Sequence, residues 1–123
     1  MPIIHPPEMG EETPDGEVIC PMVEAVKHVG SAWKLVVISY LMNGGKGFNE
    51  LLRTIPGLNS KTLSRTLKQL QEDGIVERKI VSLQPFSVKY ILTEKGKALE
   101  PVISSLKDWS LKWVVNKKDG GKT

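Results

Sequence analysis

The hydrophobic period of the chain changes at Gly74, and this change limits the folds that the sequence can adopt. Before it, apolar residues recur every three or four positions over 21–73, as in amphipathic helices. After it, the runs 75–81 and 87–92 are rich in β-branched and aromatic residues, which predicts an antiparallel hairpin. From Thr93 the helical period returns. The sequence therefore predicts a mainly α fold with one small β-hairpin.

Residues that start and stop helices divide the part before the hairpin into four segments. Proline suits the first helical turn, serine and asparagine cap N-termini, and glycine commonly follows a C-terminus. By these signals we expect helices over 21–29, between the cap Ser31 and the stop at Asn43, over roughly 48–54, and from Asn59 to Asp73, where Asn59 or Ser60 is the cap. A last long helix is expected after Thr93, and Pro101 should bend it or break it after its first turn.

The two ends of the chain differ from its middle in composition and charge. Residues 1–17 contain four prolines and no hydrophobic period, so we expect a flexible acidic arm. Residues 116–123 are rich in lysine and glycine and are expected to form a flexible tail. One domain is left, over 18–115. All 17 Lys and Arg residues but only nine acidic residues follow Ile19, and this net charge of +8 suits a polyanionic partner.

Three helices, a capped fourth helix and then a hairpin is the element order of a winged helix-turn-helix. In such a fold the fourth helix enters the major groove of DNA and the hairpin, called the wing, lies along the backbone or a minor groove. The leucines of 59–73 lie on one face, and the other sides carry hydroxyls and long cations suited to bases and phosphates. The predicted DNA-binding residues are Ser60, Lys61, Thr62, Ser64, Arg65 and Lys68 on the helix, and Arg78, Lys79 and Gln84 on the wing.

Other interpretations of these features remain open. An isolated helix of this kind is more often a solvated amphipathic helix, and lysines on an edge hairpin also discourage aggregation. The alternative function is a winged-helix module that docks on protein or RNA without reading a DNA sequence. We do not expect an enzyme, because the sequence has no converging acid, base or nucleophile and no glycine-rich phosphate loop before a helix.

Apolar stripes on the first and last helices predict a homodimer. These stripes are larger than a domain of this size needs to bury, so the two helices should form an interface with a second copy. The interface residues expected are Met22, Val26, Leu99, Val102, Ile103, Leu106, Trp109 and Trp113. A dimer of this kind should read a palindromic operator in double-stranded DNA.

The chain offers no sign of a metal, a cofactor or a membrane span. Its one cysteine, Cys20, and its two histidines, His5 and His28, have no zinc-ligand spacing. No apolar run reaches the 18 or so residues that a span needs, and the N-terminus lacks the pattern of a signal peptide. We therefore expect a cytoplasmic protein.

Several short motifs occur in a fixed order along the chain. They are Cys20-Pro21, Gly30-Ser31-Ala32-Trp33-Lys34, Phe48-Asn49-Glu50-Leu51-Leu52-Arg53, Ile55-Pro56-Gly57-Leu58, Gly74-Ile75-Val76-Glu77-Arg78, Tyr90-Ile91-Leu92-Thr93-Glu94-Lys95-Gly96, Pro101 and Trp109. Over about Val18 to Trp113, this set resembles the HxlR family of bacterial and archaeal winged-helix regulators. The resemblance implies a dimer built from the first and last helices, and palindromic DNA read by the fourth.

The chain departs from that family's usual pattern at two positions. Gly47 stands where the family usually has arginine, and Lys89 stands where it usually has glutamate. The first change removes a phosphate contact or a structural ion pair, which Lys46 could replace. The second adds positive charge to the wing.

Cys20 is a candidate sensor of oxidants or electrophiles. Some members of the family respond to such compounds through a cysteine at this position, and the start of a helix favours the reactive thiolate. The alternative is that Cys20 is a small buried hydrophobic residue. Because the chain has one cysteine, a reversible disulfide would join two chains or a chain and a small thiol.

Overall fold

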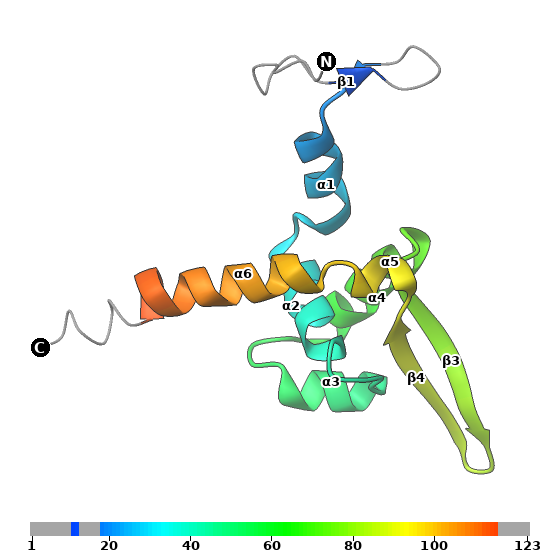
Figure 1. The fold of residues 1–123 in the computed structure, drawn as a ribbon. Helices are drawn as coiled ribbons and strands as arrows, with labels where there is room; N and C mark the ends of the chain where they lie inside the picture. Colours follow the sequence, from blue (N-terminus) through cyan, green and yellow to red (C-terminus); the bar gives the residue numbers. More distant parts are fainter. Residues whose placement is uncertain (1–10, 13–17, 116–123) are drawn as a thin grey trace, which may run out of the picture.

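A computed structural model describes residues 11–12 and 18–115 of the chain (Figure 1). Its elements are β1 (Glu11–Glu12), β2 (Val18–Ile19), α1 (Pro21–Val29), α2 (Ala32–Leu41), α3 (Phe48–Thr54), α4 (Ser60–Glu72), β3 (Val76–Leu83), β4 (Phe86–Leu92), α5 (Glu94–Lys97), α6 (Glu100–Ser110) and a π-helical turn (Leu111–Val115). This order confirms the predicted winged helix-turn-helix. The predicted tail, and the arm apart from Glu11 and Glu12, lie outside the described residues.

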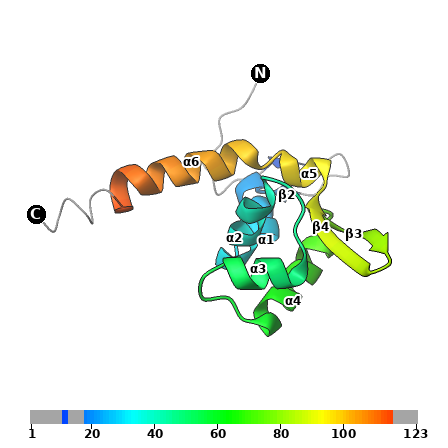
Figure 2. The same cartoon turned by 90° about the horizontal axis from the view of Figure 1, so that it is seen from below.

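Aliphatic side chains from α2, α3 and α4 form most of the buried core. Leu63, Leu67 and Leu70 of α4 are fully or almost fully buried, which confirms the predicted leucine face. They belong to one cluster with Ile38 of α2 and Leu51 of α3. Truncating such a leucine to alanine costs about 2–5 kcal/mol. The core therefore fixes the position of α4, and Figure 2 shows α4 beside α3 on one side of the helical body.

Local hydrogen bonds set both ends of α4. Asn59 is the N-cap, and its Oδ1 accepts a hydrogen bond from the Thr62 backbone N–H at 2.8 Å. At the other end Gly74 takes a φ of +74°, which favours glycine, and the Ile75 N–H returns to the Leu70 carbonyl at 2.9 Å. Asn59 is thus the cap of the two that the sequence left open. Ser31 precedes α2, but its side chain makes no capping hydrogen bond.

The wing is an antiparallel hairpin that projects from the helical body (Figure 1). Val76 pairs with Leu92 at its base and Leu83 with Phe86 at its tip, and the register shifts between Ile80 and Ser82. Lys46, ahead of α3, adds a bridge to Tyr90, with backbone hydrogen bonds of 3.0 and 2.8 Å. This bridge anchors the base of the wing to the segment before α3.

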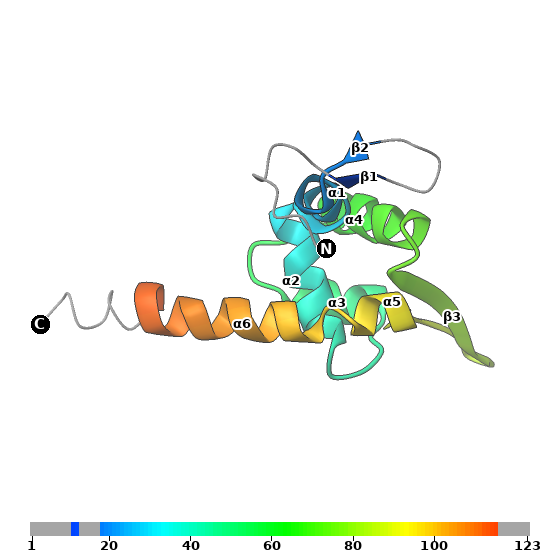
Figure 3. The same ribbon diagram turned by 45° about the horizontal axis from the view of Figure 1, so that its top comes forward.

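The C-terminal helical region is divided, as the proline predicted. Thr93 caps α5, the chain leaves the helix at Ala98 and Leu99, and Pro101 lies in the first turn of α6. Gly96 is required here because a Cβ would clash with the backbone carbonyl oxygen of Ile75. From this break, α6 extends away from the helical body on the side opposite the wing (Figures 1 and 3).

Two details of the structure add to the sequence predictions in this region and at the N-terminus. Ile103, which was expected in the dimer interface, is only 5% exposed and belongs to the core of the single chain. It lies where α6 leaves the body, so its neighbours are α2 and the core. Glu11 and Glu12, within the expected flexible acidic arm, form β1 and pair with Ile19 and Val18.

Candidate nucleic-acid interface

The side of α4 away from the leucines presents hydroxyl, amide and cationic side chains to solvent. Five of the six predicted residues are exposed: Ser60, Lys61, Ser64, Arg65 and Lys68. Thr62 is half-buried, and its backbone N–H is bound by the cap, so it contributes less surface than predicted. Thr66 lies among the leucines and is buried. The exposed group therefore runs along one side of α4, over its first three turns.

The wing carries a second group of exposed cations. Arg78, Lys79 and Gln84 are exposed as predicted, and so is Lys89. Lys79 and Lys89 face each other in the strand register, so their side chains leave the same face of the hairpin. At the tip, Leu83 and Phe86 are 76% and 61% exposed, although both are apolar. An exposed apolar tip beside basic side chains is suited to a groove of a nucleic acid.

No carboxylate among the described residues forms an ion pair with the cations of α4 or of the wing. The four ion pairs within the described part of the chain involve Lys27, His28, Lys34 and Lys97. Exposed cations that no ion pair neutralises keep most of their field toward solvent, which attracts a polyanion. Electrostatically, the two groups together can hold phosphates and leave Arg65 free to donate to a base edge.

Asp73 ties the end of α4 to α1 and α2. Its Oδ2 lies 3.7 Å from Lys34 Nζ, and its Oδ1 lies 3.8 Å from His28 Nδ1. Lys34 is only 11% exposed at its side chain and also donates to the Lys27 carbonyl at 3.4 Å. Sequence reasoning missed this cluster, because a single lysine within an apolar helix gives no signal of its partner. The cluster fixes the C-terminal end of the candidate DNA-reading helix.

Apolar side chains remain exposed on two helices that were predicted to form the dimer. On α6 and the π-helical turn, Val102, Leu106, Trp109 and Trp113 recur at helical spacing, and Trp109 is 58% exposed. Met22 and Val26 of α1 are exposed too. Leu99 is half-buried and packs against the core, so it belongs mainly to the single chain. Six of the eight predicted interface residues are therefore on the surface of the described chain, and the other two are Leu99 and Ile103.

Cys20 stands immediately before α1 and is partly buried. It is the N-cap residue by position, and its carbonyl accepts the Glu24 N–H at 3.0 Å. The helix that it precedes carries the exposed apolar residues Met22 and Val26. Chemistry at this thiol would therefore act at the start of a candidate interface helix.

The described residues contain no cluster of three or more His, Cys, Asp or Glu side chains that could hold a metal ion. In that same part of the chain, none of the helices has the length and apolar character to cross a membrane.

The three-helix core, the exposed cationic helix and the basic wing define the chain as a winged helix-turn-helix transcriptional regulator. The family described as HxlR-like helix-turn-helix matches residues 28–118. The chain belongs to this family, as its motifs indicated.

Individual relatives agree with this assignment. The HTH-type transcriptional regulator YodB of Bacillus subtilis is 40% identical over 96 residues, which are 77% of this chain and 86% of YodB. An HTH-type transcriptional regulator of Methanothermobacter thermautotrophicus is 33% identical over 112 residues, 91% of this chain and 86% of the relative.

Solved structures show the same fold. The redox regulator HypR in its oxidised form superposes with a TM-score of 0.71 at 34% identity, covering 76% of this chain and 96% of HypR. The reduced form of YodB from B. subtilis gives a TM-score of 0.68 at 38% identity, covering 79% of this chain and 96% of YodB.

Proposed function

We propose that this regulator binds double-stranded DNA as a homodimer, with α4 in the major groove and the wing on the flanking backbone, and that it carries out no catalysis. The observation that carries the proposal is the set of exposed cations on α4 and the wing, none of which pairs with a carboxylate among the described residues. A DNA-binding regulator works in the compartment that holds the DNA. We expect that compartment to be the cytoplasm.

The homodimer follows from the exposed stripes of α1 and α6. Trp109, Leu106 and Val102 together expose more apolar surface than a monomer of this size usually leaves in water. Because α6 extends away from the body opposite the wing, a second copy can cover it without meeting the DNA-reading side (Figure 1). Two copies related by a two-fold axis would place two α4 helices on a palindromic operator, about one turn of DNA apart.

We also propose that oxidants or electrophiles regulate DNA binding through Cys20. HypR is named a redox regulator, and YodB has been solved both bound to a quinone and treated with diamide. Cys20 of this chain stands at the start of α1, where a covalent change would disturb the proposed interface. The two relatives and this position support the proposal together.

Salt dependence tests the proposed DNA binding against docking on protein or RNA. Binding sequences are selected from a random duplex pool, and their affinity is measured between 50 and 200 mM salt. A protein that neutralises six or more phosphates should lose affinity about a thousandfold or more over this range. A flat salt response would favour a module that docks on protein, since RNA binding also neutralises phosphates, and a pool without enrichment of any sequence would favour docking on protein or RNA.

A further inference from the structure

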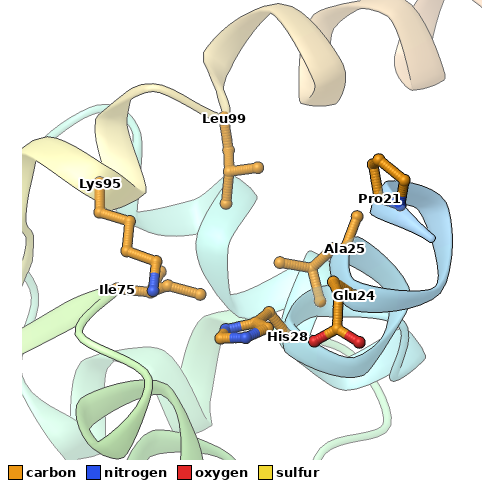
Figure 4. A pocket seen from close by; sticks show the side chains of 8 residues that line it. Pro21, Glu24, Ala25, His28, Ile75, Lys95 and Leu99 are labelled. Atoms are coloured by element: carbon orange, nitrogen blue, oxygen red, sulfur yellow. The ribbon is translucent and has the colours of Figure 1, made fainter. Parts of the chain in front are cut away.

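A cavity of about 420 Å³ lies between α1 and the region where α4 leads into β3 and α5 leads into α6. Ala25, Ile75 and Leu99 form apolar walls from three of these segments (Figure 4). Small-molecule sites commonly measure 300–1,000 Å³ and are mostly apolar with a few polar groups. Met22 and Val26 are not among the lining residues, so the cavity is distinct from the exposed stripe of α1.

Two of the three polar side chains in the wall are already engaged. Lys95 Nζ donates to the Asp73 backbone carbonyl at 2.7 Å. Glu24 Oε2 lies 3.2 Å from Lys27 Nζ. Glu24 thus has an ionic partner, whereas Lys95 is held by a backbone carbonyl and keeps its positive charge. The other five lining residues are apolar, so the body of a ligand that fits this wall is apolar.

His28 is the third polar side chain, and it makes no hydrogen bond to any described residue. Its Nδ1 is buried and lies 3.8 Å from Asp73 Oδ1, whereas 40% of the side chain remains exposed. In a neutral imidazole one nitrogen carries the proton and the other accepts. The carboxylate of Asp73 favours the proton on Nδ1, which leaves Nε2 as an acceptor. The group that satisfies it is a hydrogen-bond donor.

We propose that this cavity binds a small molecule with an apolar body and one hydroxyl group, which donates its hydrogen bond to His28 Nε2. Asp73 is the C-cap of α4 and contacts both His28 and Lys95. A ligand in the cavity should therefore change the position of the C-terminal end of α4 and, with it, operator affinity. The binding step stands apart from the proposed DNA function. The expected effect on operator affinity rests on the proposed DNA function.

Calorimetry on the full chain tests the binding step, with 2-naphthol as the probe and 2-methoxynaphthalene as a matched compound without the donor. We expect 2-naphthol to bind about three- to tenfold more tightly, the worth of one hydrogen bond. Ala25→Phe fills the cavity and should abolish binding. Ala32→Phe makes the same change at an exposed alanine that does not line the cavity, and binding should persist.

Several outcomes would overturn the proposal. Equal affinity for the two compounds would remove the role of His28, and that comparison remains decisive even if Ala25→Phe does not fold. Failure of 2-naphthol to bind would contradict the proposed small-molecule site and would mean that a partner chain covers the cavity. Amide NMR spectra recorded during a titration with 2-naphthol locate the binding site. Chemical-shift changes on α6 instead of at Gly74 would mean that the compound binds the surface around Leu106. If 2-naphthol binds but operator affinity is unchanged, the coupling to α4 is wrong, because linkage must be reciprocal.

Discussion

Lys79 of β3 lies directly opposite Lys89 of β4 in the register of the wing. Both side chains are exposed, and neither forms an ion pair with a described carboxylate. Like charges in opposed positions of a sheet destabilise it, whereas an opposite-charge pair contributes roughly 0.2–1 kcal/mol. The HxlR family usually has glutamate at the position of Lys89. This wing therefore keeps two positive charges at a cost in folding stability, which is expected of a surface that meets phosphate.

Lys89→Glu should change stability and DNA binding in opposite directions. The free energy of unfolding should rise by roughly 0.2–1 kcal/mol in a urea titration, because Lys79 gains a partner. Affinity for all duplexes should fall, and the salt slope should decrease by about one unit for each phosphate that the wing no longer neutralises. Lys107→Glu on α6 is the control, with the same charge change away from the wing. A joint loss of stability and affinity would mean that the wing unfolds and that charge is not the cause.

Much of the fold could be predicted because local signals agree with one another. The leucine face of α4, the cap at Asn59 and the positive φ at Gly74 each follow from residues within one short segment. The position of Ile103 could not be predicted this way. Helical spacing places it near the exposed stripe of α6, and only the packing of α6 on the body assigns it to the core.

The candidate DNA interface was more accessible to sequence reasoning than the contacts that support it. Polar and cationic side chains opposite an apolar stripe are visible in the helical period, and all the residues predicted on α4 except Thr62 are exposed. The cluster of Lys34, His28 and Asp73 joins residues that are far apart in the sequence. No periodicity records such a long-range ion pair, so only the folded chain reveals it.

Trp109→Ala should weaken dimerisation and DNA binding together. Trp109 lies in the exposed stripe of α6, and large aromatic residues at the centre of an interface often contribute about 2 kcal/mol or more. Sedimentation at micromolar concentration should show a shift toward monomer, and operator affinity should fall because two half-sites need two protomers. Asp108→Ala, at the neighbouring exposed position, is the control and should change neither. A wild-type chain that is monomeric at this concentration would contradict the proposed dimer.

Diamide should alter operator affinity in the natural protein and leave Cys20→Ser unaffected. Diamide takes two electrons and two protons from the Cys20 thiol and a second thiol, which then form a disulfide, either between chains or with added glutathione. The modified residue lies at the start of α1, so the proposed interface should change with it. Mass spectrometry identifies the product, and anisotropy on labelled operator measures affinity. An equal response of both proteins would remove Cys20 as the sensor.

Arg65→Ala should reduce the sequence preference of the protein rather than its general affinity for DNA. Arg65 is exposed in the second turn of α4, on the side away from the leucines, and arginine donates two hydrogen bonds to guanine when it enters the major groove. The substitution should cost about 1–3 kcal/mol on the selected operator and relax the preference at one base position in each half-site. Anisotropy on the operator and on single-base variants measures both effects. The control is Arg53→Ala, which removes an exposed arginine from the neighbouring α3 and not from α4. Any loss of affinity that it causes should be equal for all duplexes. If Arg65→Ala keeps the full sequence preference while Lys79→Ala on the wing abolishes it, the wing reads the sequence and the proposed orientation on DNA is wrong.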